Sequence, residues 1–148
     1  MKILFICGGN TCRSPMAKTI LKQILKQRGL EGKVFVDSVA GGTPSGPKAT
    51  REAREVIKQL YGVDLLVDHK SKSVSIVSVD DFDLILTMEE RQKLGLPKNK
   101  TYTLKEYARI RGDIDDPFGM SFEEYRRCCN EIKECLYKVV ERVLGPSS

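Results

Sequence analysis

The chain has 148 residues, with 25 Lys and Arg against 20 Asp and Glu, one His, five Cys and no Trp. That length predicts one domain spanning residues 1–148, with a core large enough to need no disulfide or metal for stability. The single histidine, His69, excludes a zinc site that needs two histidines, and the odd number of cysteines argues against a disulfide framework. The net charge of +5 is spread along the chain, so we expect no nucleic-acid partner.

The N-terminal segment carries no feature typical of export or membrane insertion. Its apolar run, 3–7, is far too short to span a membrane, and it leads straight into a glycine-rich loop without a cleavage region. We therefore expect a cytoplasmic protein with reduced thiols and no membrane partner.

Short apolar strands alternate with amphipathic helices along the chain. In chain order we expect a strand at 2–7, a helix from 15 to about 29, a strand at 34–36, a loop at 39–47, a helix at 49–61, strands at 83–88 and 101–104, a loop at 109–121 and a helix at 122–144. This alternation predicts a parallel sheet covered on both faces, in which ligands bind at the carboxyl ends of the strands. The functional site is therefore expected in the loop after the first strand, 8–14.

That loop has the composition of an anion-binding cradle. Gly8 and Gly9 allow the backbone to turn its N–H groups inward, and Asn10 tolerates a left-handed conformation. Ser14 is a good N-cap and Pro15 suits the first helical position, so the loop ends at a helix N-terminus that favours an anion.

Two side chains in the loop carry the chemistry. Arg13 offers a bidentate fork for phosphate oxygens, and Cys7 stands at the strand end, where amides, the helix dipole and Arg13 stabilise its thiolate form. Cys7 is then a nucleophile that needs no histidine base. The simpler alternative is a buried thiol beside a tight turn, and a nucleotide-binding P-loop is disfavoured because the Gly-Lys-Ser/Thr ending is missing.

Residues 7–17, CGGNTCRSPMA, resemble the signature of the low-molecular-weight protein tyrosine phosphatase family, in which Cys is followed by five residues, Arg, and Ser or Thr. The resemblance extends over essentially the whole chain, through DLILTM at 83–88, TLKEY at 103–107 and DPFG at 116–119. It implies a single-domain three-layer α/β/α fold with a four-stranded parallel sheet in the order 2-1-3-4 and a phosphate loop after strand 1. It also implies a monomer that uses no metal or cofactor.

The resemblance assigns roles to the loop residues. It makes Cys7 the nucleophile and Arg13 the phosphate ligand, and a further group binds or supports the phosphate: Gly8, Gly9, Asn10, Thr11, Cys12 and Ser14. Cys12 is also expected to form a protective disulfide with Cys7 under oxidation, although simple packing is the alternative.

A phosphatase also needs a proton donor for its leaving group. The segment 112–119, GDIDDPFG, offers Asp113, Asp115 and Asp116, and Pro117 restricts Asp116 to extended conformations. The resemblance selects Asp116, with Asp115 as the second choice and a solvated acidic turn as the alternative. The expected reaction passes through a phosphocysteine intermediate that Asp116 then helps water to hydrolyse.

The expected partners are phosphorylated proteins, with phosphoarginine favoured over phosphotyrosine. Thr11 and Phe118 resemble the bacterial protein arginine phosphatase branch, and a threonine hydroxyl suits a guanidinium better than an aromatic ring. The opposite wall, expected from 39–47, carries Thr43 and Pro44 rather than the aromatic residue that relatives often place there. The alternative is a protein tyrosine phosphatase.

Three further readings of the fold remain as alternatives. An arsenate reductase would need cysteines between Cys12 and Cys128, a phosphocarrier would not carry this Arg-Ser pair with a distant Asp-Pro, and a flavodoxin-like binding module would carry FMN. Outside the loop, we expect three cysteines to pack in the last helix: Cys128, Cys129 and Cys135. His69 is expected to brace the first loop by a hydrogen bond.

Overall fold

The computed structural model describes residues 1–146, and these contain a four-stranded sheet whose strands are all parallel, in the order β2-β1-β3-β4. The strands are β1 Lys2–Cys7, β2 Phe35–Ala40, β3 Leu84–Thr87 and β4 Thr101–Thr103. The predicted parallel sheet and its strand order are thereby confirmed, and β1 occupies the centre, where its carboxyl end meets loops from both neighbours.

Four α-helices and three 3-10 turns surround the sheet. The helices are α1 Arg13–Gln27, α2 Arg51–Tyr61, α3 Leu104–Tyr107 and α4 Phe122–Leu144. The 3-10 turns are η1 Val74–Ile76, η2 Val79–Asp81 and η3 Glu90–Lys93. None of the described helices is long and apolar enough to cross a membrane.

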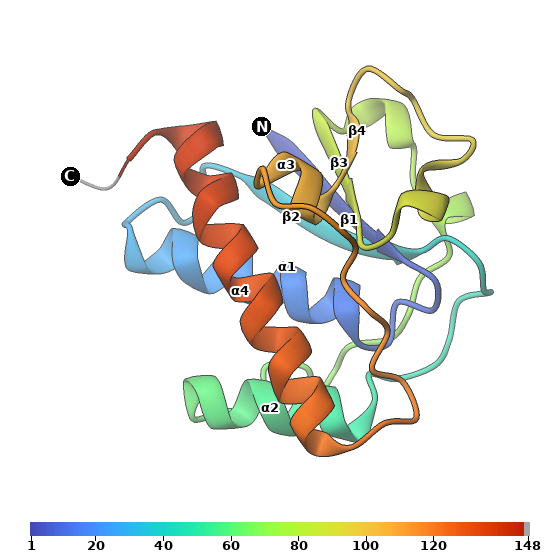
Figure 1. Cartoon of the computed structure of the whole chain (residues 1–148), viewed down its shortest axis with the longest axis vertical. Helices are drawn as coiled ribbons and strands as arrows, with labels where there is room; N and C mark the ends of the chain where they lie inside the picture. The colour runs from blue at the N-terminus through green and yellow to red at the C-terminus, as the bar shows by residue number, and fades with distance from the viewer. Residues whose placement is uncertain (147–148) are drawn as a thin grey trace.

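The two faces of the sheet are covered differently. Successive side chains of β1 point to opposite faces. Ile3 and Phe5 join the larger buried cluster with α1, α2 and α4, whereas Leu4 and Ile6 join a smaller cluster under η1, η2 and the residues that follow η3. Figure 1 shows α1 and α4 lying across one face, with α2 at the lower edge. The heavily covered face therefore holds α1 rigidly against the strand that leads into it.

Two predicted boundaries were wrong near the site. The second strand continues beyond 34–36 to Ala40 and carries two buried polar residues, Asp37 and Ser38. Asp37 can lie within a buried strand because it binds Lys72 at 2.6 Å and Lys18 at 3.2 Å. The polar residues interrupt the apolar pattern, and their partners are distant in sequence.

The first helix begins at Arg13, two residues before the predicted start at 15, and its N-cap is Cys12. Ser14 is therefore inside the first turn and is not the cap, because its hydroxyl is engaged in the loop instead. The last helix starts and ends where the sequence predicts, with Ser121 as its cap. The three cysteines of this helix are buried, as expected of packing residues: Cys128, Cys129 and Cys135.

Candidate active site

The loop between β1 and α1 forms the floor of a pocket of about 340 Å³. Its walls come from four parts of the chain and comprise Cys7, Gly9, Thr11, Cys12, Arg13, Thr43, Pro47, Asp116 and Phe118. The structure thus brings the predicted nucleophile, phosphate ligand and acid to one cavity at the carboxyl end of the central strand.

The thiol of Cys7 is buried and is contacted by two groups of its own loop. The backbone N–H of Asn10 donates to Cys7 Sγ at 3.3 Å, and Ser14 Oγ lies 2.9 Å from the same sulfur. Asn10 Nδ2 donates to Ser14 Oγ at 2.7 Å, and the Ser14 hydroxyl proton is then free to point toward Cys7. The loop thus places a backbone N–H and a hydroxyl group against the same sulfur.

Asn10 organises the loop. Its φ of 53° lies in the left-handed region, as the sequence predicts for this residue. Its side chain is fully buried, and besides Ser14 it donates to Ser38 Oγ at 3.0 Å and accepts from the backbone N–H of Lys72 at 3.0 Å. Both N–H groups and the oxygen of the amide are therefore bonded within the protein, which holds the turn in one conformation.

His69 braces this turn from outside, as predicted. Its Nε2 lies 2.7 Å from the carbonyl oxygen of Asn10. Burial lowers the pKa of His69, and the nearby Lys18 and Lys72 lower it further. The neutral ring has a single N–H, and since a carbonyl only accepts, that proton is on Nε2. The only histidine of the chain therefore supports the loop and does not touch the pocket.

The two glycines of the loop do not adopt the left-handed backbone conformation that favours glycine. Neither Gly8 nor Gly9 has a left-handed φ, and among the described residues of the loop only Asn10 does. The backbone there is held from the opposite wall, because Gly41 N donates to Cys7 O at 2.9 Å and Gly42 N donates to Gly8 O at 3.1 Å. The loop 39–47 is thus fastened directly to the phosphate cradle.

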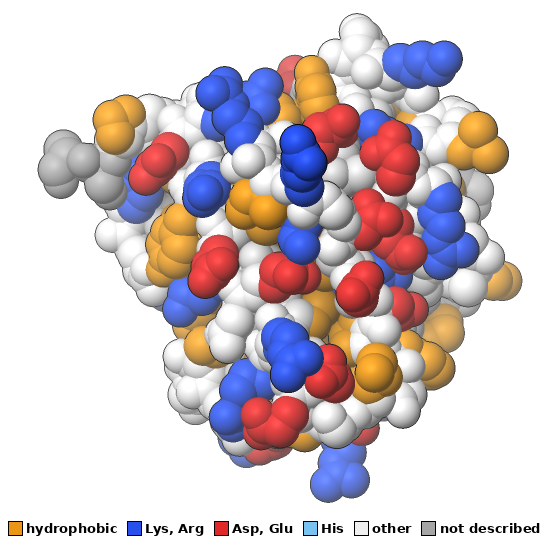
Figure 2. Space-filling model, in the orientation of Figure 1, with side chains coloured by type: hydrophobic (Ala, Val, Ile, Leu, Met, Phe, Trp, Pro, Cys, Tyr) orange, Lys and Arg blue, Asp and Glu red, His pale blue; other side chains and the backbone are white. Residues whose placement is uncertain are grey.

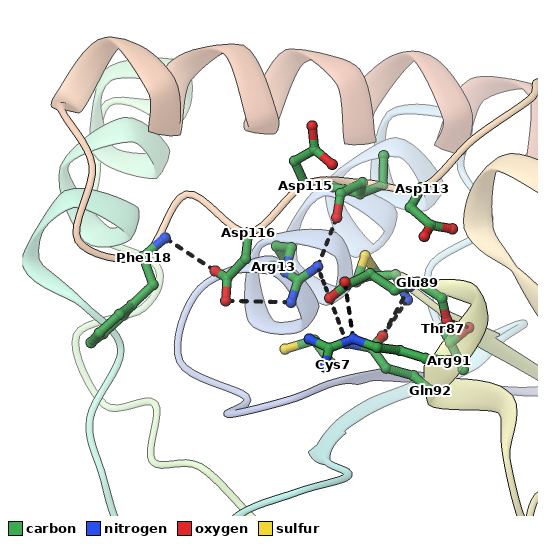
Figure 3. A network of polar contacts seen from close by, with 12 residues as sticks. Cys7, Arg13, Thr87, Glu89, Arg91, Gln92, Asp113, Asp115, Asp116 and Phe118 are labelled. Carbon is green, nitrogen blue, oxygen red and sulfur yellow. Dashed lines mark hydrogen bonds and ion pairs between the residues drawn. The ribbon is translucent and has the colours of Figure 1, made fainter.

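Arg13 is buried and held on one side only. Its Nη1 donates to Glu89 Oε2 and to the carbonyl oxygen of Ile114, each at 2.7 Å (Figure 3). Burial alone would lower the pKa of Arg13, but Glu89, Cys7 and Asp116 hold it above its ordinary value. The buried Nε has no hydrogen-bond partner among residues 1–146. A buried donor without a partner is costly, so this edge of the guanidinium is suited to receive a phosphoryl oxygen.

Only one of the three candidate acids points into the pocket. Asp116 Oδ2 lies 3.6 Å from Arg13 Nη2, and Asp116 Oδ1 accepts from the backbone N–H of Phe118 at 3.0 Å. Asp113 instead accepts from the backbone N–H of Glu90, and Figure 3 shows Asp115 directed away from Arg13. The Asp116 side chain is about half exposed at 49%, so a molecule that enters the pocket can reach it.

Glu89 is a member of the site that the sequence interpretation missed. It lies two residues beyond the end of β3, and besides Arg13 it binds Arg91 and Gln92 (Figure 3). Burial by itself would raise the pKa of Glu89, but hydrogen bonds from Arg13 and Arg91 outweigh burial and hold it below its ordinary value. Its position just past the carboxyl end of a parallel strand was the signal that could have found it.

The predicted redox partner, Cys12, is buried beside the acid. Its thiol lies 3.7 Å from Asp116 Oδ1, and both Cys7 and Cys12 are free thiols in this structure. Burial, together with Cys7 and Asp116, raises the pKa of Cys12 to about 12. At neutral pH the proton therefore stays on Cys12.

Comparison with known proteins assigns the chain to one group. A family model described as low molecular weight phosphotyrosine protein phosphatase matches residues 2–145. The protein-arginine-phosphatase of Bacillus subtilis (strain 168) is 34% identical over 150 residues, which cover 97% of each chain. The structure of a low molecular weight protein tyrosine phosphatase from T. tengcongensis gives a TM-score of 0.86 at 36% identity and covers 97% of this chain and 99% of that chain. A mutant of the YwlE arginine phosphatase with a phosphorylated active-site serine gives a TM-score of 0.86 at 33% identity, with 97% and 95% covered.

Proposed function

Since the chain belongs to the low molecular weight phosphotyrosine protein phosphatase family and is a cysteine-based phosphatase, we propose that its substrate is phosphoarginine in proteins. The observation that carries this choice is the set of hydrogen-bonding side chains in the pocket wall. Thr11 and Thr43 supply hydroxyl groups, Asp116 supplies a carboxyl group, and Phe118 is the single aromatic residue of the lining. The N–H groups of a guanidinium find acceptors on these side chains, which a phenyl ring would leave unused.

In the proposed first step, the Cys7 thiolate attacks phosphorus in line and the bond from phosphorus to the arginine nitrogen breaks. The free edge of Arg13 and the loop amides bind the equatorial oxygens, where negative charge accumulates. Asp116, protonated at the start of this step, gives its proton to the departing nitrogen, so that the arginine leaves as its guanidinium and Asp116 becomes a carboxylate.

The second step returns the enzyme to its starting state. Asp116, now ionised, accepts a proton from water as that water attacks the phosphocysteine. The bond from phosphorus to sulfur breaks, and phosphate leaves. The Ser14 hydroxyl and the Asn10 N–H receive the sulfur as a thiolate, which makes it a better leaving group. A relative with a phosphorylated active-site serine supports a phosphoryl-enzyme at this position.

The test is a comparison of kcat/KM on two peptides of one sequence, carrying phosphoarginine or phosphotyrosine, with Cys7→Ser as the blank. We expect the wild-type protein to prefer phosphoarginine. Thr11→Ile replaces a hydroxyl in the pocket wall by apolar surface, so it should shift the ratio toward phosphotyrosine by about 10- to 100-fold. Thr43→Val is a second variant that removes a wall hydroxyl at nearly constant volume.

A wild-type ratio that favours phosphotyrosine would overturn the arginine assignment and leave a tyrosine phosphatase, the activity for which the T. tengcongensis relative is named. A Thr11→Ile ratio equal to the wild-type ratio would show that this position does not select the leaving group. Equal phosphate release by Cys7→Ser and wild type would remove the proposed nucleophile.

A further inference from the structure

A second hollow adjoins the acid loop outside the active-site pocket. It has a volume of about 470 Å³ and is lined by Arg51, Glu52, Glu55, Met120 and Phe122. Met120 is 55% exposed, and Phe118, two residues earlier, is 65% exposed while it lines the catalytic pocket. One exposed segment, 118–120, thus contributes a lining residue to the catalytic pocket and another to this hollow.

The apolar side chains at this place stay on the surface although the core is close by. In Figure 2 several hydrophobic side chains gather at the lower right of the molecule, where the chain approaches α4. Phe122 forms the floor, since it packs against the main core and its ring lies 5.3 Å from the Arg126 guanidinium carbon. A fixed aromatic floor with an exposed methionine beside it is typical of a surface that binds an apolar side chain.

The rim of the hollow has a net negative charge. Glu52 and Glu55 lie three residues apart on α2 and so share one side of the helix, and Arg51 is the one cation among the lining residues. None of these three residues forms an ion pair with another residue of the range 1–146. A partner that places a basic residue next to an apolar one complements this rim.

We propose that this hollow is a docking site for the substrate polypeptide, which binds there an apolar side chain flanking the phosphorylated residue, with a basic residue beside it. The proposal rests on the proposed function, since it assumes a protein substrate in the catalytic pocket. Phe118 and Met120 are two residues apart in a turn, so their Cα atoms lie at most about 7 Å from each other. The flanking apolar residue is therefore expected two or three positions from the phosphorylated one.

The test uses phosphoarginine peptides that carry Leu or Ser two positions before or two positions after the phosphorylated residue. We expect Leu in one of these positions to raise the wild-type kcat/KM about tenfold over Ser, because it buries apolar surface in the hollow. Met120→Ser should reduce this preference to less than about twofold. Each value is divided by kcat/KM on free phosphoarginine, so that a general loss of activity cancels.

Leu94→Ser is the matched control, because Leu94 is 92% exposed and lines neither hollow. It should keep the tenfold preference. A second variant, Glu55→Gln, should lower the gain from a Lys placed beside the Leu. Equal turnover of the Leu and Ser peptides by wild type, or a preference that survives Met120→Ser, would overturn the docking site.

Two further arms separate this proposal from its alternatives. The same peptides with phosphotyrosine test the hollow independently of the arginine assignment. If the protein turns over that series with the same Leu preference, the docking site stands and the arginine assignment fails. Analytical ultracentrifugation of wild type and Met120→Ser tests a second copy of the chain as the occupant. If wild type dimerises and Met120→Ser does not, the occupant of the hollow is a second copy of the chain and not the substrate, which would overturn the proposal.

Discussion

At the scale of the residue, the phosphate loop depends on Asn10 more than on the glycines beside it. Asn10 combines a left-handed backbone with a buried amide whose partners are Ser14, Ser38 and the backbone of Lys72. Asparagine is one of the few residues with a side chain that occupies this backbone region readily. The same residue therefore sets the turn and directs the Ser14 proton toward Cys7.

The pair Asn10→Gly and Asn10→Ala separates these two contributions. Both variants lose the buried hydrogen bonds, which we expect to lower the free energy of unfolding by about 1–3 kcal/mol. Alanine also meets the left-handed strain, so Asn10→Ala should be less stable than Asn10→Gly by roughly 1 kcal/mol. Urea unfolding of the three proteins measures the order. Outside the left-handed region, an alanine variant is usually more stable than a glycine variant. If Asn10→Ala were likewise more stable than Asn10→Gly, this result would contradict the role of the backbone.

At the scale of the element, the end of β3 joins the phosphate loop to the acid loop. Ile114 N donates to Met88 O at 2.9 Å, and Ile114 O accepts from Arg13, which Glu89 holds from the other side. The short segment that follows β3 therefore positions both Arg13 and the start of the loop that carries Asp116. Residues 109–121 lack regular structure over most of their length, yet this part is fixed by backbone hydrogen bonds to a strand end.

We expect Glu89→Gln to lower the free energy of unfolding by about 1–3 kcal/mol at pH 7, because it removes the charged partner of a buried arginine. The folded-state pKa of Glu89 lies below its ordinary value of 4.5, so the carboxylate stabilises the fold above that pH. The difference from wild type should therefore shrink as the pH falls below about 4.5. Urea unfolding at pH 7 and at lower pH measures it, and kcat/KM should also fall as Arg13 loosens.

Glu90→Gln is the matched control for this experiment. Glu90 is the adjacent residue, its side chain is 67% exposed, and it pairs only with Lys93 at 2.9 Å. An exposed pair contributes little, so this variant should stay within about 0.5 kcal/mol of wild type. Equal effects of the two substitutions would show that burial of the Glu89 pair does not matter.

At the scale of the whole molecule, the stability of the fold should depend on pH through one histidine. The folded-state pKa of His69 is lowered, first by burial and then by Lys18 and Lys72, so the unfolded chain binds the proton more readily. Stability is therefore lost as the pH falls through about 6.5 toward the folded-state pKa. In His69→Gln, whose amide can still donate to Asn10 O, this loss should be absent.

Urea unfolding of both proteins at pH 8 and pH 5.5 provides the measurement. The stability of wild type relative to His69→Gln should be greater at pH 8 than at pH 5.5. A difference that is constant, or larger at the lower pH, would contradict a lowered pKa. Since the chain has one histidine, no second imidazole contributes to the comparison.

The sequence predicted the sheet, the long last helix and the phosphate loop because each depends on neighbouring residues. Apolar runs define β1 and β3, period-3.6 burial defines α4, and the loop chemistry lies within nine consecutive positions, 7–15. The same locality explains the failures. The second strand was ended too early because Asp37 and Ser38 break the apolar pattern, and their partners lie far away along the chain.

The sequence by itself therefore determined the class of chemistry: a thiol and an arginine on a loop that turns into a helix. Only the tertiary structure decided which groups complete that chemistry. It directed Asp116, and neither Asp113 nor Asp115, toward Arg13, and it brought Glu89 against the guanidinium. The physical reason is range, since a nucleophile loop is built from adjacent residues, whereas its acid and its counter-charge arrive from strand ends and loops about 75 to 100 residues away.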